Sequence, residues 1–201
     1  MPTLLTDAPE IPLPLAPPRK RWTREQCAPL EASGLFEIEK LELVDGELIS
    51  KMGKKRPHVN ALIRLQWWLL RVFGPDFVHP EAPINVAPQD NLSSEPEPDL
   101  IVTSRDLSHF LVLNPQPADV VLLVEIANTT LGFDLTTKAR LYARAGIADY
   151  WVVDVPGWRI IVHRDPVDGV YRMVASYAEE ELVPALAAAG ADLRIADIFP
   201  A

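Results

Sequence analysis

The fold is decided by residues 120–155, which read VVLLVEIANTTLGFDLTTKARLYARAGIADYWVVDV. The segment opens with VVLLVEIA at 120–127, a nearly continuous apolar run typical of a strand covered on both faces of a sheet. The next part, DLTTKARLYARAG, predicts a helix with Asp134 as N-cap and Gly146 just after its end. A second apolar run, DYWVVDV at 149–155, predicts another strand. Strand, helix and strand in this order predict a right-handed βαβ unit.

Two further helices are expected before this unit. WTREQCAPLEASG predicts a short helix with Thr23 as N-cap, Gln26 completing a capping box and Gly34 at the end. Residues 57–73 carry a broad apolar stripe and precede Gly74-Pro75, which predicts a mostly buried helix.

Hairpins and short strands complete the expected architecture. Asp45-Gly46 and Asp168-Gly169 each lie between strand-like runs and predict hairpins, while PDLIVTS and ADLRIADIF predict short strands. We therefore expect an α/β (α+β) fold in which a mixed central sheet is flanked by helices. Residues 21–201 are expected to form a single domain, and residues 1–20 a flexible proline-rich arm.

The composition of the chain excludes several classes of protein. No apolar run is long enough to cross a bilayer, and the first residues lack the features of a signal peptide. The single cysteine, Cys27, excludes an internal disulfide, so we expect a cytoplasmic protein. The net charge of −9 disfavours loose, sequence-independent binding to nucleic acid, but it does not exclude a site where metal ions screen the acids.

The chemistry is expected to come from acids and a lysine. Glycine-rich nucleotide-binding motifs and the GxSxG motif are absent, and the four histidines do not have metal-ligand spacing. Glu125 stands inside an apolar strand, on the face expected for Val121, Leu123 and Ala127, where a lone carboxylate is costly unless it is paired or bound to a cation. Asp99 is a second acid at the start of a strand. The alternatives are a Glu125 that lies on a sheet edge or in a salt bridge, and an Asp99 that only closes a proline-rich loop.

Lys138 is the expected partner of these acids. A step of 100° per residue places it on the helix face of Leu141 and Tyr142, whereas Arg140 and Arg144 point towards water. A lysine drawn inward to Glu125 would explain both anomalies, and a lysine that snorkels beside the core is the alternative. Two carboxylates and a lysine suit phosphodiester hydrolysis assisted by Mg²⁺, or by Mn²⁺ in its place.

Several strings together resemble the Uma family of endonucleases. They are LELVDGELI, PDLIV, LLVEIAN and above all KARLYARAGIADYWVVD, and the resemblance extends from about Leu41 to Val155. It implies the restriction-endonuclease fold with a PD…(D/E)xK type of active site, in which Asp99 and Glu125 hold the metal. Ala127 occupies the usual lysine position, and in this family the lysine comes from the helix, which matches Lys138.

The resemblance also implies an acid near the first hairpin and a histidine. Glu42 is our choice for the auxiliary catalytic acid, with Glu47 as its alternative. His58 matches the histidine of the family pattern, and a capping or structural role for it is favoured over catalysis.

The basic loop KMGKKR is the expected contact with DNA. It contains Lys51, Lys54, Lys55 and Arg56, and a plain solvated loop is the alternative. We expect a Mg²⁺-dependent DNA endonuclease that acts as a homodimer. Two other hypotheses remain: a non-catalytic nucleic-acid-binding or regulatory module, and an assembly protein in which Glu125 and Lys138 form only a salt bridge.

Overall fold

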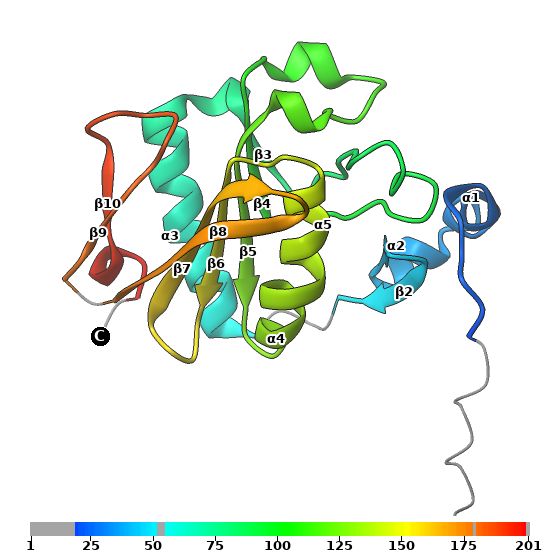
Figure 1. Ribbon diagram of the computed structural model, residues 1–201, viewed down its shortest axis with the longest axis horizontal. Coiled ribbons are helices and arrows are strands. Elements are labelled where there is room, and N and C mark those ends of the chain that lie inside the picture. The colour runs from blue at the N-terminus through cyan, green and yellow to red at the C-terminus, as the bar shows by residue number, and fades with distance from the viewer. Residues whose placement is uncertain (1–18, 52–54, 179, 200–201) are drawn as a thin grey trace, which may run out of the picture.

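The computed structural model describes residues 19–51, 55–178 and 180–199. Its centre is a six-stranded sheet in the order β3-β4-β5-β6-β7-β8 (Figure 1). Only β5 and β6 pair in parallel, and the other neighbours in this sheet are antiparallel. The expected parallel pairing and mixed sheet are therefore confirmed. The strands are β3 (Val78–Pro80), β4 (Leu100–Thr103), β5 (Val120–Ala127), β6 (Asp149–Asp154), β7 (Arg159–Val167) and β8 (Val170–Ala178).

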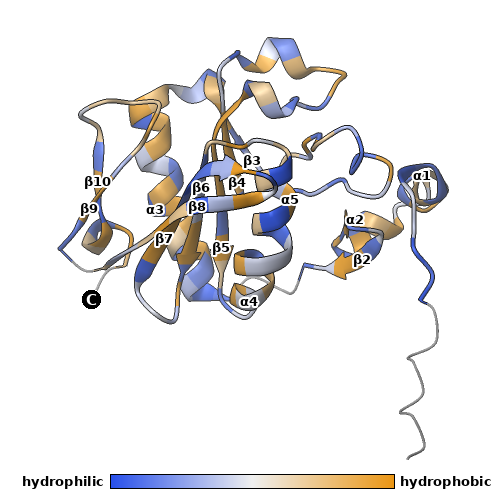
Figure 2. Cartoon of the chain, viewed as in Figure 1, coloured by the Kyte–Doolittle hydropathy of each residue, from blue (hydrophilic) through white to orange (hydrophobic). Residues whose placement is uncertain are grey.

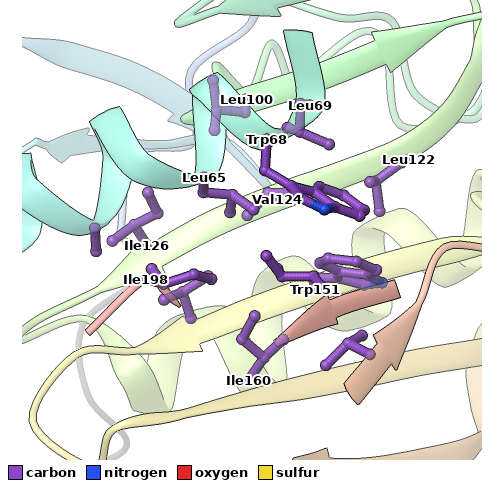
Figure 3. Packing of buried hydrophobic residues seen from close by; sticks show 14 of the residues in the cluster. Leu65, Trp68, Leu69, Leu100, Leu122, Val124, Ile126, Trp151, Ile160 and Ile198 are labelled. Carbon is purple, nitrogen blue, oxygen red and sulfur yellow. The ribbon is translucent and has the colours of Figure 1, made fainter. Parts of the chain in front are cut away.

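One face of the sheet is covered by α3 (Arg56–Phe73) and by the C-terminal segment. α3 buries Leu65, Trp68 and Leu69 against strand residues such as Val124 and Trp151 (Figure 3). The rings of Trp68 and Trp151 lie 6.0 Å apart in a tilted arrangement. The apolar stripe predicted for 57–73 is the reason this helix packs on the sheet.

The opposite face is covered by α5 (Ala139–Arg144), as Figure 1 shows. Leu141 and Tyr142 of this helix pack with Leu123 of β5 and Tyr150 of β6. Figure 2 shows hydrophilic and hydrophobic segments alternating along α5, in keeping with its buried Leu141 and exposed Arg140. The two apolar faces make the sheet the middle layer of three.

The segment before α5 departs from the predicted helix. It begins three residues earlier, with α4 (Leu131–Phe133), and continues through a π-helical turn, η4 (Asp134–Lys138). The prediction of Asp134 as N-cap is wrong, because Asp134 lies inside the helical segment and its side chain is buried. The predicted end is confirmed, since Gly146 follows the helix with a φ of 77°.

The start of β5 also differs from strict alternation. Leu123 and Ala127 pack on the α5 side, but Val121 packs with the α3 cluster. The register between β4 and β5 shifts at Val102/Thr103, opposite the beginning of β5. Such an irregularity reverses the facing of residues on one side of it.

The first hairpin forms as predicted. It pairs β1 (Leu41–Val44) with β2 (Glu47–Ser50), and Asp45 and Gly46 have φ angles of 46° and 75°. Positive φ at both central residues defines the type I′ turn that Asp-Gly favours. An isolated bridge from Leu43 to Glu95 joins β1 to the segment before β4.

The remaining elements lie around this framework. Thr23 accepts a hydrogen bond from the Gln26 amide at 3.3 Å, which confirms the predicted N-cap of α1. Gly34 separates α1 from a second short helix that was not predicted.

No helix in the described ranges has the length and apolar character required to cross a membrane. Most of the expected arm, residues 1–18, lies outside the described residues. The other elements are α1 (Arg24–Ala32), α2 (Leu35–Glu39), β9 (Leu182–Pro184), β10 (Asp192–Arg194) and the 3-10 turns Pro75–Phe77, Leu107–Phe110, Pro117–Asp119 and Ile195–Asp197.

Candidate active site

A cavity of about 90 Å³ lies at the carboxyl end of β5. It is lined by residues from β1, β5, the π-helical turn, the start of α3 and the loop before β4. Its chemistry comes from four carboxylates, a histidine and a buried lysine. These are Glu42, Asp99, Glu125, Asp134, His58 and Lys138.

Asp99 and Glu125 come to this cavity from neighbouring strands. Leu100 pairs with Val124 in the antiparallel register, so one further step places Asp99 beside Glu125. The carboxylate of Asp99 accepts a hydrogen bond from the amide of Ile126 at 2.8 Å, which anchors it at the end of β5. The structure thus brings the two predicted metal-binding acids to one site.

Lys138 connects two of the carboxylates. Its Nζ lies 2.8 Å from Glu125 Oε1 and 2.8 Å from Glu42 Oε1. All three side chains are buried. The predicted proximity of Lys138 to Glu125 is confirmed, and the lysine reaches the acid from the helix rather than from position 127.

Glu42 is held in place by the first hairpin. It alternates with Leu43 along β1, and its Oε2 accepts a hydrogen bond from the amide of Glu97 at 3.1 Å. The alternative acid, Glu47, instead lies 3.8 Å from Arg21 and has a side chain that is 41% exposed. Of the two acids beside Asp45-Gly46, only Glu42 lines the cavity.

Two site residues were not recognised in the sequence. Tyr142 donates a hydrogen bond from its hydroxyl to Glu125 Oε1 at 2.8 Å, and Asp134 accepts one from the Thr130 hydroxyl at 2.7 Å. Both residues stand four positions from Lys138, on the same side of the helical segment. This spacing is a usable signal, but the local pattern favours a helix cap for Asp134 and a core position for Tyr142.

Burial and mutual repulsion shift the protonation of these acids. Burial raises the pKa of Glu125 to about 8; Lys138 opposes the shift, and Asp134, Glu42 and Asp99 add to it. Burial likewise raises the pKa of Asp134 to about 6, against the effect of Lys138 and the Thr130 hydrogen bond. Burial lowers the pKa of Lys138, but Glu125, Glu42 and Asp134 outweigh it, so the net shift is upward and the ammonium stays charged. The cavity therefore holds more carboxylates than its lysine can neutralise.

His58 supplies an unpartnered nitrogen. It is the third residue of α3, is buried, and lines the same cavity. Its Nε2 lies 3.6 Å from Asp99 Oδ1, beyond hydrogen-bond distance, and has no hydrogen-bond partner among the described residues. This nitrogen does not cap the helix. A buried polar atom that lines a cavity and lacks a hydrogen-bond partner indicates a site for a ligand or a water molecule.

The basic loop lies partly at the mouth of the cavity. Lys51 and Lys55 line it, and Lys51 forms a 3.0 Å ion pair with Glu97. Arg56 is the first residue of α3 and is exposed. Lys54 lies outside the described residues.

The donor set fits a hard divalent cation. Mg²⁺ binds through one or two carboxylates and keeps several waters, which matches Asp99 and Glu125 at the end of two adjacent strands. The raised pKa values show that burial and the neighbouring acids disfavour the charged carboxylates, and a bound cation would favour the charged form again. Within the described ranges, no group of three or more His, Cys, Asp or Glu side chains is arranged to hold a metal by itself, so waters or substrate oxygens would complete the coordination.

Comparison with solved structures supports the fold. The chain resembles the crystal structure of "a putative nuclease belonging to DUF820" from Anabaena variabilis ATCC 29413, with a TM-score of 0.64 and 18% sequence identity. The match covers 79% of this chain and 89% of that chain. No curated protein matches the sequence.

Comparison with family models gives a direct assignment. The model of the Uma2 family, whose description is "Putative restriction endonuclease", matches residues 25–196. The match includes β1, α3 and the whole segment from β4 to β8, and so every residue of the cavity described above. The chain belongs to the Uma2 family.

Proposed function

We propose that this protein is a DNA endonuclease that hydrolyses phosphodiester bonds with Mg²⁺, or with Mn²⁺ in its place. The observation that carries the proposal is the ammonium of Lys138, held 2.8 Å from both Glu42 and Glu125 in the cavity that Asp99 also lines. A salt bridge that served stability alone would need one acid for one lysine. Here four carboxylates surround one buried lysine, which leaves carboxylates that a cation can bind when it displaces their protons.

Asp99 and Glu125 are the residues that would hold the metal. Bound there, Mg²⁺ would lower the pKa of a coordinated water and screen the negative charge of the phosphate. Tyr142 and Lys138 both donate to Oε1 of Glu125, and this fixes the orientation of its carboxylate. The hydrogen bond from Ile126 does the same for Asp99.

Lys138 stabilises the charge that develops on the phosphate. Its ammonium is already desolvated and oriented by Glu42 and Glu125, so little reorganisation is needed in the transition state. Glu42 thereby acts as a positioning residue. His58 Nε2, which lacks a protein hydrogen bond within the described residues, is placed to accept a proton from the attacking water.

The basic loop brings the DNA backbone to the cavity. Lys55 lines the cavity and Arg56 is exposed beside it, which supports phosphate contacts at the point where cleavage would occur. Lys51 and Lys54 belong to the same loop. The proposal includes a homodimer and a cytoplasmic location. Light scattering of the purified protein tests the dimer.

A plasmid-nicking assay tests the function. Supercoiled DNA should be nicked with Mg²⁺ or Mn²⁺ and left intact with EDTA, Asp99→Ala should abolish nicking, and Lys138→Ala should slow it strongly. Binding of the same plasmid fragments without metal is measured in parallel. DNA bound equally well with and without metal, and never cleaved, would identify the non-catalytic binding module instead.

A further inference from the structure

The cations of this acidic protein are unevenly distributed. Residues 48–75 contain six of the 19 Lys and Arg residues and none of the 28 Asp and Glu residues. The segment includes the basic loop and all of α3, whereas the chain as a whole has a net charge of −9. A positively charged region on a protein whose net charge is negative indicates a polyanionic partner. Its cations are Lys51, Lys54, Lys55, Arg56, Arg64 and Arg71.

The cations of α3 form a stripe with a tryptophan in its middle. At 100° per residue, Arg56, Arg64, Trp67 and Arg71 fall within an arc of about 80°, on the side away from the core residues Leu65, Trp68 and Leu69. Trp67 is 66% exposed, which is unusual for the largest apolar side chain. Arg64 and Arg71 lie one turn before and one turn after it.

A groove runs beside this stripe. It encloses about 410 Å³ between α3 and the C-terminal segment, and Arg64, Trp67 and Arg71 line it from the helix side. Asp197 also lines the groove, but its carboxylate is paired with Arg194 at 2.8 Å. Arg64 donates a hydrogen bond to the carbonyl of Asp197 at 3.2 Å, which holds the guanidinium at the groove.

We propose that the outer face of α3 binds a single-stranded segment of nucleic acid. The phosphates contact Arg64 and Arg71, and an unpaired base stacks on Trp67. Such binding rests on the nuclease function proposed above, because it names the substrate that the cavity receives: DNA with a single-stranded stretch. A base can cover an exposed indole only when it is not stacked inside a duplex.

The stripe on α3 begins beside the cavity. Lys55 lines the cavity and Arg56 begins the stripe, so one basic surface continues from the site to the helix. Arg56 and Trp67 are separated by about 16 Å along the helix axis at 1.5 Å per residue, a distance that a few nucleotides of a single strand can span. A strand cleaved at the cavity would therefore reach Trp67 with its next few nucleotides.

Metal-free binding measurements test this assignment. Fluorescence anisotropy is recorded in EDTA with a labelled 20-nucleotide oligothymidylate and with a duplex of the same length. The wild type should prefer the single strand, and Trp67→Ala should weaken that binding by about 5- to 150-fold, whereas Trp67→Phe keeps most of it. Arg64→Ala/Arg71→Ala should weaken it and reduce the salt slope by about 1.4.

The matched control removes two exposed arginines elsewhere. Arg140 on α5 and Arg172 on β8 are both exposed and lie outside α3, so Arg140→Ala/Arg172→Ala changes the net charge equally and should leave binding and its salt slope unchanged. Thermal melting checks that each variant is folded. Equal loss in both double variants would show a general charge effect and overturn the assignment.

Two further results would also overturn it. One is single-strand binding that does not depend on Trp67; the other is a Trp67→Ala variant that changes only the oligomeric state, which would make this face a contact between copies. Because no cleavage is scored, failure here with intact metal-dependent nicking removes only the α3 assignment. Trp67-dependent binding by a protein that never nicks would remove the nuclease proposal and leave this one standing.

Discussion

The ammonium of Lys138 lies 2.8 Å from Glu125 Oε1, although the two residues belong to different elements, a helical turn and a strand. Ala127 stands two residues after Glu125, at the position where a PD…(D/E)xK site carries its lysine, so the lysine beside this acid comes from the helix. The π-helical turn at Asp134–Lys138 widens the helix at the point where the lysine turns inward. Such turns recur at functional sites.

Removal of the helix lysine should separate catalysis from binding. Lys138→Ala removes a charge needed mainly in the transition state, so single-turnover cleavage should fall by about 10²- to 10³-fold while DNA affinity changes little. It also leaves Glu42 and Glu125 without a cation, so the metal-free protein should lose stability, by about 3–5 kcal/mol, that Mg²⁺ partly restores. Lys138→Arg should not rescue cleavage fully, since a planar guanidinium is a poor substitute for a compact ammonium. Cleavage and DNA affinity that fell by the same factor would contradict a transition-state role.

The stabilising effect of Mg²⁺ should grow with pH. The pKa of Glu125 is raised to about 8 and that of Asp134 to about 6, so the folded metal-free protein binds these protons more tightly than the unfolded chain does. The contribution of these two groups to stability is therefore fully present below their unfolded pKa values and is lost as the pH rises towards 8. A metal must displace these protons, and the displacement becomes easier over the same range. The increase in melting temperature on addition of Mg²⁺ should be larger at pH 8.5 than at pH 6, and Glu125→Gln should reduce that difference.

Substitution of His58 should cost activity without costing stability. Its buried Nε2 has no hydrogen bond to a described residue, so an apolar replacement loses no hydrogen bond at this atom and removes an unsatisfied polar atom. His58→Leu should keep or raise the melting temperature and lower cleavage by about 10²- to 10⁴-fold. His163 provides the matched control, because its buried Nδ1 is also unpartnered within the described residues and it does not line the cavity. His163→Leu should leave cleavage unchanged; an active His58→Leu enzyme would return His58 to a structural role.

The basic loop should contribute salt-dependent affinity for DNA. Replacement of Lys54, Lys55 and Arg56 by Ala releases fewer counterions on binding, so affinity should fall and its dependence on salt should flatten. The control replaces Arg19, Arg140 and Arg172, which are exposed and lie outside this loop. A salt slope that is the same in both triple variants would identify the loop as plain solvated surface.

The proline-rich arm should be dispensable for folding. Its prolines lack backbone donors and its apolar residues are too sparse to build a core, so deletion of the arm, residues 1–20, should leave the melting temperature nearly unchanged. Arg24 is the comparison residue, because it is bonded to the rest of the domain. Its guanidinium donates to the Ser94 carbonyl and the Asn85 amide oxygen, each at 2.8 Å. Arg24→Ala should lower the melting temperature by several degrees. A comparable loss on deletion of the arm would show that the arm packs on the domain.

Local chemistry was enough to predict most of the elements. The continuous apolar run at 120–127 required a strand covered on both faces, and Asp-Gly at 45–46 and 168–169 required tight hairpins, because these signals depend only on neighbouring residues. The inward position of Lys138 also followed from helical spacing. Even an interrupted helix keeps residues four apart on one side, so the π-helical turn did not move the lysine to the surface.

Only the tertiary structure decided which side chains meet. Glu42 reaches Lys138 because the hairpin is attached through the bridge from Leu43 to Glu95, a long-range contact that leaves no local pattern. Asp134 was interpreted as a helix cap because Asp favours caps in isolation, whereas in the fold it is buried beside Lys138. The sequence by itself determined the elements and their apolar faces. The packing of those faces determined the charge balance of the cavity, because burial and proximity, on which each pKa depends, are properties of the assembled fold.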